Sequence, residues 1–440
     1  MKADLCGWPR SNLTRLARWL ELRSSPYIAN RIISLLKRYG FTSRKAKQRV
    51  LECVQLMAKY ECRPTFPTPG RVVRRDPKFF QTIQAMGAEL NIHGYDHIDF
   101  LSLSWEEANK QFARALDAFD AAGIRAQGFR CPYLSYSAAL IDALPDRMTY
   151  SSNEAIVWDV LPDTDRPSTA VFGTLQEFYR AKPCTQAVSM PKITGAIVEL
   201  PIGIPDDLQM FDGLKMDKEA IAQAWSTILR RTHRAGELFA LLFHPELIDE
   251  CKDAFEAVLR TARKLRPAVW VTQLRDVSEW WREKSGFTVE AANVCSGLRL
   301  RLNCSERATL VVRDVITSAA TQPWDGRYKV FRGDELLISS RRRPFIGLSQ
   351  GCPDNIVSFL REQGFIVESG PHASQCTMYL DDAVLANCRN DRQVLDCIEN
   401  SPAPLIRYWP WPNGAKSALC MTGDLDALDL IDYASRLYIK

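Results

Sequence analysis

The stretch KSALCMTGDLDALDL, residues 416–430, decides how we expect this chain of 440 residues to fold. Its apolar run predicts a buried strand, and two carboxylates, Asp424 and Asp426, follow that run. Because residues two apart in a strand point to the same side, both acids should face one side. Adjacent buried carboxylates are costly unless a cation lies beside them, so we expect a metal ion and an arginine here. Alternatively, one of the two acids caps a helix over residues 427–438, which leaves the other unexplained.

Stretches that predict strands alternate with amphipathic stretches that predict helices from about residue 63 to residue 284. Strands are expected within residues 63–70, 88–94, 124–133, 196–205 and 238–245, and helices within residues 76–87, 104–123, 217–236 and 251–265. Ser104 and Glu107 have the spacing of a capping box at the start of one of these helices. This alternation is typical of a parallel sheet or a β/α barrel. Further helices are expected within residues 12–60.

The rhythm changes after about residue 285. GLRLRLNCSERATLVVRDV, residues 297–315, alternates apolar and polar residues and predicts antiparallel strands, and residues 328–340 predict a hairpin around Gly333 and Asp334. Residues 286–340 are therefore expected to form a small β-rich module. Residues 341–404 alternate short strands and helices, which indicates a small α/β module.

The charge of the chain is unevenly spread. Residues 1–75 contain 17 Lys and Arg against four acids, a net +13, whereas the rest of the chain has 40 against 48, a net −8. We expect mainly solvated helix faces in the basic segment, with peripheral contact to a membrane surface or a phosphorylated ligand as the functional alternative. No stretch predicts a signal peptide or a transmembrane segment, and the thirteen cysteines include no C-x-x-C pair. A cytoplasmic protein with reduced thiols is therefore expected.

Two of the five histidines stand in NIHGYDH, residues 91–97, after an expected strand. The H-x-x-x-H spacing places His93 and His97 on one side of a helical turn, so both imidazoles could bind one metal ion. The alternative is a pair of unrelated structural histidines.

Two more motifs follow expected strands. GFRCPYL, residues 128–134, contains Arg130, which could hold a carboxylate through two hydrogen bonds or form only a structural salt bridge. LLFHPEL, residues 241–247, places His244 at the end of an apolar run. That histidine is either a hydrogen-bonded structural residue or part of an active site. In β/α folds the catalytic residues lie at the C-terminal ends of the strands.

Together these motifs resemble the polysaccharide deacetylase family, also called the NodB-homology family or carbohydrate esterase family four. That family has a distorted β/α barrel with T-x-D-x-D, H-x-x-x-H, R-x-P-Y and L-x-x-H-P motifs at its strand ends. HGYDH, RCPY and LLFHP stand in the family's order over about residues 48–283, but TGDLD stands near the C-terminus. The resemblance therefore implies a circular permutation, in which the C-terminal strand lies beside RPTFPTPG, residues 63–70.

The expected fold is thus α/β. A distorted β/α barrel of the deacetylase type is formed by residues 1–285 and closed by residues 405–440. The β-rich module of residues 286–340 and the α/β module of residues 341–404 are inserted between these two parts.

The resemblance also implies a role for each residue of the site. His93, His97 and Asp426 would hold one divalent metal ion, for which zinc is the expected choice. Asp424 would be the general base that takes a proton from the attacking water, and Arg130 would hold that carboxylate in place.

Two further groups complete the implied chemistry. The backbone N–H of Tyr133 would bind the oxyanion, and His244 would protonate the leaving amine. The chain departs from the family in having Leu134 where glycine is common, and Ser151 where an aspartate orients the acid histidine. Asp159 is the substitute that we expect for that missing aspartate.

These roles predict a hydrolase of carbon–nitrogen, non-peptide bonds. The expected enzyme is a metal-dependent N-deacetylase acting on the acetamide of an N-acetylated amino sugar or glycan precursor, which could be nucleotide- or lipid-linked. The alternatives are hydrolysis of a non-sugar linear amide by the same residues, and a non-catalytic carbohydrate-binding or scaffold protein. No nucleic-acid partner is expected.

Overall fold

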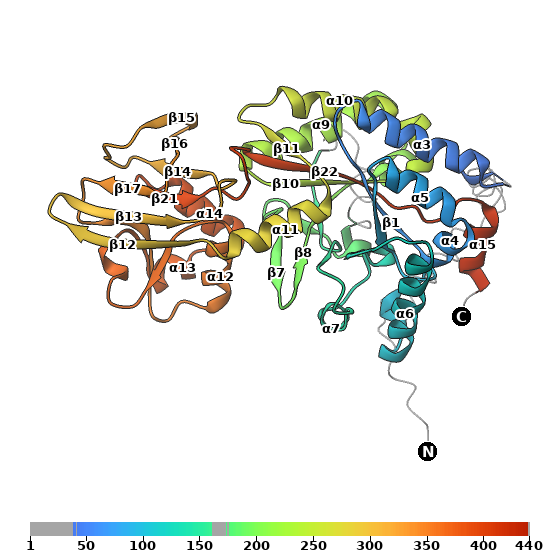
Figure 1. Ribbon diagram of the computed structural model, residues 1–440, viewed down its shortest axis with the longest axis horizontal. Helices are drawn as coiled ribbons and strands as arrows, with labels where there is room; N and C mark the ends of the chain where they lie inside the picture. Colours follow the sequence, from blue (N-terminus) through green and yellow to red (C-terminus); the bar gives the residue numbers. More distant parts are fainter. Residues whose placement is uncertain (1–37, 41, 161–172, 174–175, 439–440) are drawn as a thin grey trace, which may run out of the picture.

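The computed structural model describes residues 38–40, 42–160, 173 and 176–438. A barrel-like α/β part and a group of smaller sheets lie side by side along the long axis of the molecule (Figure 1). The helices expected before residue 38 lie outside the described residues. Within the described ranges, no helix is both long and apolar enough to cross a membrane.

Twelve strands form one curled sheet in the order β6-β5-β9-β10-β22-β1-β2-β3-β4-β8-β7, with β11 also paired to β22. Their bounds are β1 Thr65–Thr68, β2 Glu89–Ile92, β3 Gly128–Phe129, β4 Tyr150–Ser151, β5 Ala155–Val157, β6 Lys182–Pro183, β7 Lys192–Thr194, β8 Ile197–Glu199, β9 Ile202–Ile204, β10 Leu238–Phe243, β11 Val269–Val271 and β22 Ser417–Gly423. All pairs are parallel except β7 with β8. Strands β4 and β8 lie near one edge of the sheet. Along the chain β4 is followed directly by β5, and β8 by β9, and both of these strands lie near the opposite edge. These short connections curl the sheet into the expected distorted barrel.

Strand β22 is the contribution of the C-terminal stretch. It pairs with β10 from Ala418 opposite Leu238 to Gly423 opposite Phe243, and with β1 through Thr422 opposite Thr65. Figure 1 shows it as a long red arrow that runs from the smaller sheets into the barrel. The expected position of this strand beside residues 63–70 is therefore confirmed.

Amphipathic helices cover the outside of the sheet. The helices of the barrel part are α3 Arg44–Ala58, α4 Gly70–Arg75, α5 Pro77–Ala85, α6 Trp105–Ala121, α7 Ala138–Asp142, α9 Lys218–Ala235, α10 Ile248–Lys264, α11 Leu274–Ser285 and α15 Leu430–Tyr438. The capping box of Ser104 and Glu107 is present at the start of α6, as expected. Pro77 occupies the first turn of α5, where its missing N–H removes no helical hydrogen bond.

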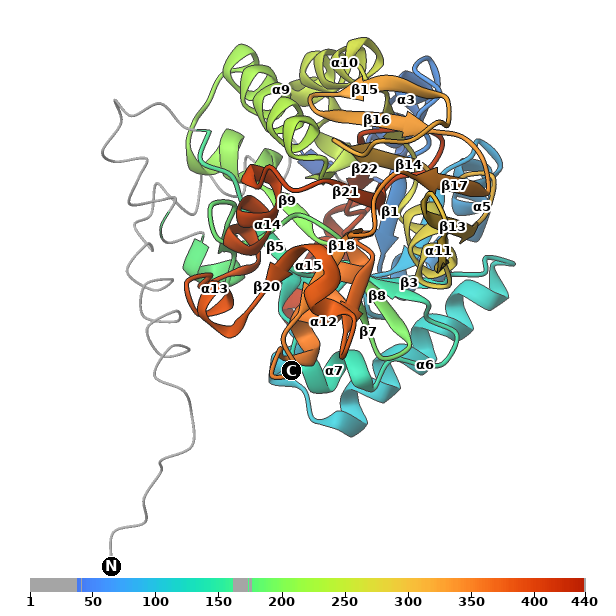
Figure 2. The same ribbon diagram turned by 90° about the vertical axis from the view of Figure 1, so that its left-hand side faces the viewer.

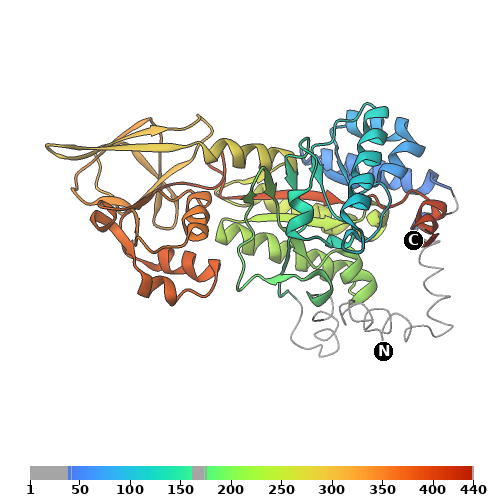
Figure 3. The ribbon, with the colours of Figure 1, turned by 90° about the horizontal axis from the view of Figure 1, so that it is seen from below.

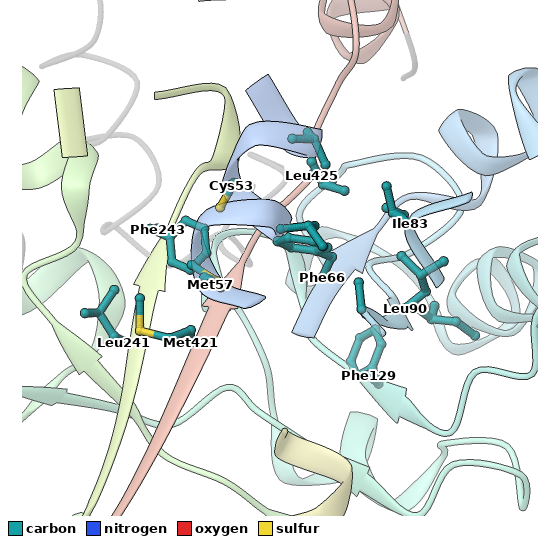
Figure 4. Packing of buried hydrophobic residues seen from close by; sticks show 14 of the residues in the cluster. Cys53, Met57, Phe66, Ile83, Leu90, Phe129, Leu241, Phe243, Met421 and Leu425 are labelled. Atoms are coloured by element: carbon teal, nitrogen blue, oxygen red, sulfur yellow. The ribbon is translucent and has the colours of Figure 1, made fainter. Parts of the chain in front are cut away.

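The barrel core joins strands that are far apart in the sequence. Figure 4 shows Phe66 of β1, Phe243 of β10 and Met421 of β22 close to Met57 of α3. The rings of Phe66 and Phe243 meet edge to face, with centroids 6.4 Å apart. Burying a side chain of this size contributes about 1.5–3 kcal/mol, so the C-terminal strand is held mainly by its apolar residues.

Residues 288–408 form three small sheets. The first contains β12 Thr288–Val294, β13 Gly297–Asn303 and β17 Glu335–Ile338; the second β14 Leu310–Arg313, β15 Thr321–Asp325, β16 Tyr328–Phe331 and β21 Leu405–Tyr408; the third β18 Arg343–Leu348, β19 Val367–Ser369 and β20 Cys376–Leu380. Helices α12 Asp354–Glu362, α13 Asp382–Ala386 and α14 Asp391–Asn400 accompany the third sheet. Figure 2, viewed from this end of the molecule, shows α12, α14 and β14–β16.

The predicted hairpin over residues 328–340 is wrong. Strand β16 pairs with β14 and β15, whereas β17 pairs with β13 in a different sheet. Period-two patterning identifies a strand and its buried face, but it does not specify the partner. Strand β21, which is expected in the segment that closes the barrel, instead pairs with β14 and so belongs to one of the small sheets.

Buried tryptophans join the small sheets to the barrel, which lie end to end in the view of Figure 3. Trp280 of α11 donates from Nε1 to the carbonyl of Pro410 at 2.7 Å. Trp411 donates in the same way to the carbonyl of Gly236 at 2.7 Å. The side chains of Trp281 and Trp411 are fully buried, with ring centroids 5.5 Å apart. This junction anchors the chain just before it enters β22.

Candidate active site

All seven residues expected in the site lie beyond the C-terminal ends of neighbouring parallel strands. His93 and His97 follow β2, Arg130 and Tyr133 follow β3, His244 follows β10, and Asp424 and Asp426 follow β22. Because these strands are parallel, their C-terminal ends meet at one edge of the sheet.

The imidazole of His93 has a defined orientation. Its Nδ1 lies 2.8 Å from the carbonyl oxygen of Arg130 and donates to it, so Nε2 carries the lone pair. That Nε2 is buried and makes no hydrogen bond within the described part of the chain. It lies 3.5 Å from Oδ1 of Asp426.

A metal ion fits between these atoms. Nε2 of His97 lies 3.3 Å from the same Oδ1 of Asp426, and the three ligand atoms all lie within 4.8 Å of one another. Atoms bound at 2.0–2.1 Å to a tetrahedral zinc ion are about 3.4 Å apart, which matches both separations. Two imidazoles and one carboxylate are a common set of protein ligands for a catalytic zinc ion.

The segment between the two histidines is not the helical turn that we expected. Gly94 has φ of 74°, and a Cβ there would lie 2.8 Å from the carbonyl oxygen of Asp96, so the chain bends instead of coiling. Oε1 of Gln111 in α6 accepts from the backbone N–H groups of Tyr95 and Asp96 at 3.1 and 2.8 Å. These hydrogen bonds hold the bend, and the two imidazole centroids are 4.9 Å apart.

Asp424 pairs with Arg130 beside the three ligand residues. Nη1 of Arg130 donates to Oδ1 of Asp424 at 2.6 Å, and the guanidinium is fully buried. Its Nε and Nη2 donate to the carbonyl and hydroxyl oxygens of Ser152, each at 3.2 Å. Oδ2 of Asp424 lies 3.8 Å from Nε2 of His93, so this second oxygen faces the ligand residues.

The helix-capping alternative for these two acids is wrong. Asp429 accepts from the backbone N–H of Asp432 at 2.8 Å and so occupies the capping role at the start of α15. Asp424 and Asp426 remain with the histidines and the arginine.

Tyr133 occupies a strained turn after β3. Its φ is 61°, an unusual value for a residue with a side chain, and its ring meets the imidazole of His97 edge to face at 4.6 Å. Asn153 accepts from the backbone N–H of Cys131 at 2.6 Å, and Glu199 accepts from the backbone N–H of Asn153 at 2.5 Å. This chain of hydrogen bonds fixes the turn that presents the Tyr133 backbone.

His244 is oriented by Asp207, a residue that sequence reasoning missed. Oδ1 of Asp207 lies 2.7 Å from Nδ1 of His244, and Oδ2 accepts from the His244 backbone N–H at 2.6 Å. Burial lowers the pKa of His244, but the charge and hydrogen bond of Asp207 outweigh it and raise this pKa to about 10. His244 is therefore protonated at neutral pH.

The expected substitute, Asp159, is not that partner. Its backbone carbonyl accepts from Arg231 at 2.7 Å, while Ser151 donates to Glu199. The signal that could have identified Asp207 is the pair of acids directly after the expected strand over residues 196–205.

Comparison with known proteins identifies part of the chain. Residues 44–147 match the family model described as polysaccharide deacetylase. This segment is similar to that family. It contains HGYDH and RCPY, whereas Asp207, His244 and both C-terminal aspartates lie outside it. The comparison with curated proteins gives no match.

Solved structures similar to this chain include one described as a polysaccharide deacetylase from Mycobacterium smegmatis. It is 20% identical over 59% of this chain and 84% of that one, with a TM-score of 0.43. A second, from Pseudomonas aeruginosa PAO1, is 15% identical over 53% and 73%, with a TM-score of 0.41. A family 4 carbohydrate esterase from Streptomyces lividans is 15% identical over 49% and 80%, with a TM-score of 0.27.

One more buried ion pair lies near the site. Arg38, which precedes α3, donates from Nε to Oε1 of Glu246 at 2.6 Å. Burial lowers the pKa of Arg38, but Glu246 and the acids Asp207 and Asp426 together raise it above its ordinary value. A segment far from the motifs in sequence therefore adds a buried positive charge that interacts with the acids Asp207 and Asp426.

Proposed function

We propose that this protein is a metal-dependent N-deacetylase that hydrolyses the acetamide of an N-acetylated amino sugar or glycan precursor. The observation that carries the proposal is the arrangement of three groups at one sheet edge: the trio of His93, His97 and Asp426, the Asp424–Arg130 pair, and the His244–Asp207 pair. Hydrolysis of a non-sugar amide by the same residues is the second candidate.

His93, His97 and Asp426 would hold the metal ion. When bound, such an ion polarises the acetyl carbonyl and makes water a stronger acid. The orientation of His93, fixed by the Arg130 carbonyl, directs its free lone pair at that position.

The remaining residues move protons and hold charge. Asp424 accepts the proton of the water that attacks the acetyl carbon, and the buried Arg130 keeps this carboxylate in position. The backbone N–H of Tyr133 stabilises the oxyanion. His244, protonated and oriented by Asp207, then donates a proton to the leaving amine as the carbon–nitrogen bond breaks, which yields acetate and a free amino group.

We also infer that the chain is a circular permutation of the family's barrel. Strand β22 takes the central place between β10 and β1, and Leu430, just after it, donates its backbone N–H to the carbonyl of Gly40 at 3.2 Å. The segment after β22 thus returns to the segment before α3, which supports a parent chain that ran directly from one to the other.

The direct test is release of acetate by the zinc-loaded protein from N-acetylglucosamine, its short oligomers, a nucleotide-linked N-acetylglucosamine and a non-sugar acetamide. We expect acetate and a stoichiometric free amine from at least one sugar substrate, and little from the non-sugar amide. No release from any sugar with zinc, cobalt or manganese would contradict the proposal, and exclusive cleavage of the non-sugar amide would establish the second candidate.

Replacing Asp207 by asparagine should shift the pH profile. The reaction requires protonated His244 as the proton donor. The activity is therefore lost as the pH rises through the pKa of this histidine. Without the Asp207 charge, burial dominates and the pKa of His244 falls below its present value of about 10. We expect the alkaline limb of kcat to move down by about one pH unit or more, so that the rate above the new limb falls by about tenfold for each further pH unit.

The matched control for this shift is Asp207→Glu, which keeps the negative charge. It should restore part of the alkaline limb. An unchanged limb in Asp207→Asn would show that His244 does not supply the proton.

A further inference from the structure

A polar cavity lies at the opposite end of the barrel from the candidate active site. Its volume is about 210 Å³, and its lining includes Arg63, Arg125, Arg275, Gln127, Gln273 and Asn91. Glu89, at the N-terminal end of β2, also lines it, whereas His93 follows the C-terminal end of the same strand. At about 30 Å³ per water molecule, the cavity has the volume of about seven waters, which suits a monosaccharide-sized ligand and not a polymer.

The cavity is lined by more positive than negative charge, because three arginines stand against one carboxylate, Glu89. Nη2 of Arg63 lies 3.9 Å from Oδ2 of Asp276, a distant pair at an exposed site. Neither Arg125 nor Arg275 forms an ion pair with any other residue that the structure describes. Guanidinium groups bind phosphate and carboxylate oxygens through two parallel hydrogen bonds, so converging arginines favour an oxyanion.

The one carboxylate in the cavity is held by groups other than the guanidinium groups. Oε2 of Glu89 accepts from Oγ1 of Thr65 at 2.7 Å and from the Arg275 backbone N–H at 3.3 Å. Its Oε1 accepts from the hydroxyl of Tyr150 at 2.5 Å. Burial raises the pKa of Glu89, and the hydrogen bonds from Tyr150 and Thr65 and the charge of Arg275 oppose that shift. No guanidinium group donates a hydrogen bond to this carboxylate, and the one side-chain hydrogen bond of Arg275 within the described residues goes to Oε1 of Gln273 at 3.5 Å.

Asn91 adds a buried acceptor. Its side chain is 1% exposed, and its Nδ2 donates to the hydroxyl oxygen of Tyr150. That hydroxyl group donates its own hydrogen bond to Glu89, so it has no proton to donate to Asn91. Oδ1 of Asn91 accepts no hydrogen bond from the described residues. Because a buried acceptor without a donor is costly, this atom favours a ligand that supplies a hydroxyl group.

We propose that this cavity binds a small hydroxylated phosphate ester of the size of a monosaccharide phosphate. The guanidinium groups of Arg125 and Arg275 bind the phosphate, with Arg63 at the exposed side, and Oδ1 of Asn91 accepts from a ligand hydroxyl. This site is separate from the proposed deacetylase reaction, and its test does not depend on turnover.

Calorimetric titration of the full chain tests this assignment. The protein is first freed of metal with a chelator, so that the histidine trio cannot capture the phosphate. We expect glucose 6-phosphate to bind more tightly than inorganic phosphate, and glucose not to bind. The Arg125→Ala/Arg275→Ala variant should bind glucose 6-phosphate at least about tenfold more weakly, because it lacks both charge-assisted contacts to the phosphate.

The matched control is Arg299→Ala/Arg301→Ala on the exposed face of β13, which removes the same charge from the small sheets and should bind as wild type. Asn91→Ala should reduce the affinity for glucose 6-phosphate to that for inorganic phosphate. Equal weakening in both double variants, or no binding of glucose 6-phosphate by the wild-type protein, would overturn the site. Tighter binding of gluconate than of glucose 6-phosphate would overturn the phosphate assignment.

Discussion

Replacing Asp426 by alanine is expected to abolish metal binding although this residue is more than 300 positions from the histidines in sequence. Oδ1 of Asp426 is the atom that both histidine Nε2 atoms approach, at 3.5 and 3.3 Å. Replacing a residue that only hydrogen-bonds to a metal ligand lowers the metal affinity by about 10- to 100-fold. Removing the ligand Asp426 itself should therefore lower the zinc affinity by about a hundredfold or more. Competition with a chromophoric chelator measures the zinc affinity directly.

The matched control for this variant is Asp253→Ala, which removes an exposed carboxylate from α10. It should bind zinc as tightly as wild type and retain full acetate release. Zinc affinity within threefold of wild type in Asp426→Ala would show that the C-terminal segment does not complete the metal site.

Replacing Asp424 by asparagine should separate metal binding from catalysis. The amide cannot accept a proton from water, and removing a general base lowers rates by about 10²- to 10⁴-fold. The hydrogen bond from Arg130 is retained because the amide oxygen can still accept it. We expect kcat to fall by about a thousandfold, with zinc affinity and KM within a few-fold of wild type.

Two measurements distinguish the base from a structural residue in this experiment. A structural role would lower the unfolding temperature and the zinc affinity together with kcat. A base role leaves both nearly unchanged and also removes the acidic limb of the pH–rate profile. A kcat within tenfold of wild type would contradict the assignment of Asp424 as the base.

The sequence predicted the site better than it predicted the pairing of the strands. His93, His97, Arg130 and His244 each follow an apolar strand, and parallel strands bring such positions together whatever their spacing. The apolar run before Asp424 likewise predicted a buried strand. In the barrel this strand, β22, lies between β10 and β1. By contrast, β16 pairs with β14 and β15, whereas β17 pairs with β13, and alternation does not encode these partners.

The partner of His244 was missed for a related reason. Asp207 stands 37 positions before the histidine, and no local spacing links the two. The bend at Gly94 was missed because H-x-x-x-H has the same spacing in a helix and in a loop, and only the left-handed φ of that glycine distinguishes them. Asp429 was overlooked as the cap of α15 because three aspartates stand close together before that helix.

The central claim is that a C-terminal strand carries a metal ligand into a site whose other ligands lie near residue 95. Anomalous diffraction at the zinc absorption edge, from crystals grown with zinc, tests it most directly. We predict a single strong peak bonded to Nε2 of His93, Nε2 of His97 and Oδ1 of Asp426, with Asp424 nearby but not bonded. A peak that is bonded to the histidines without Asp426, or the absence of any peak between them, would contradict the account.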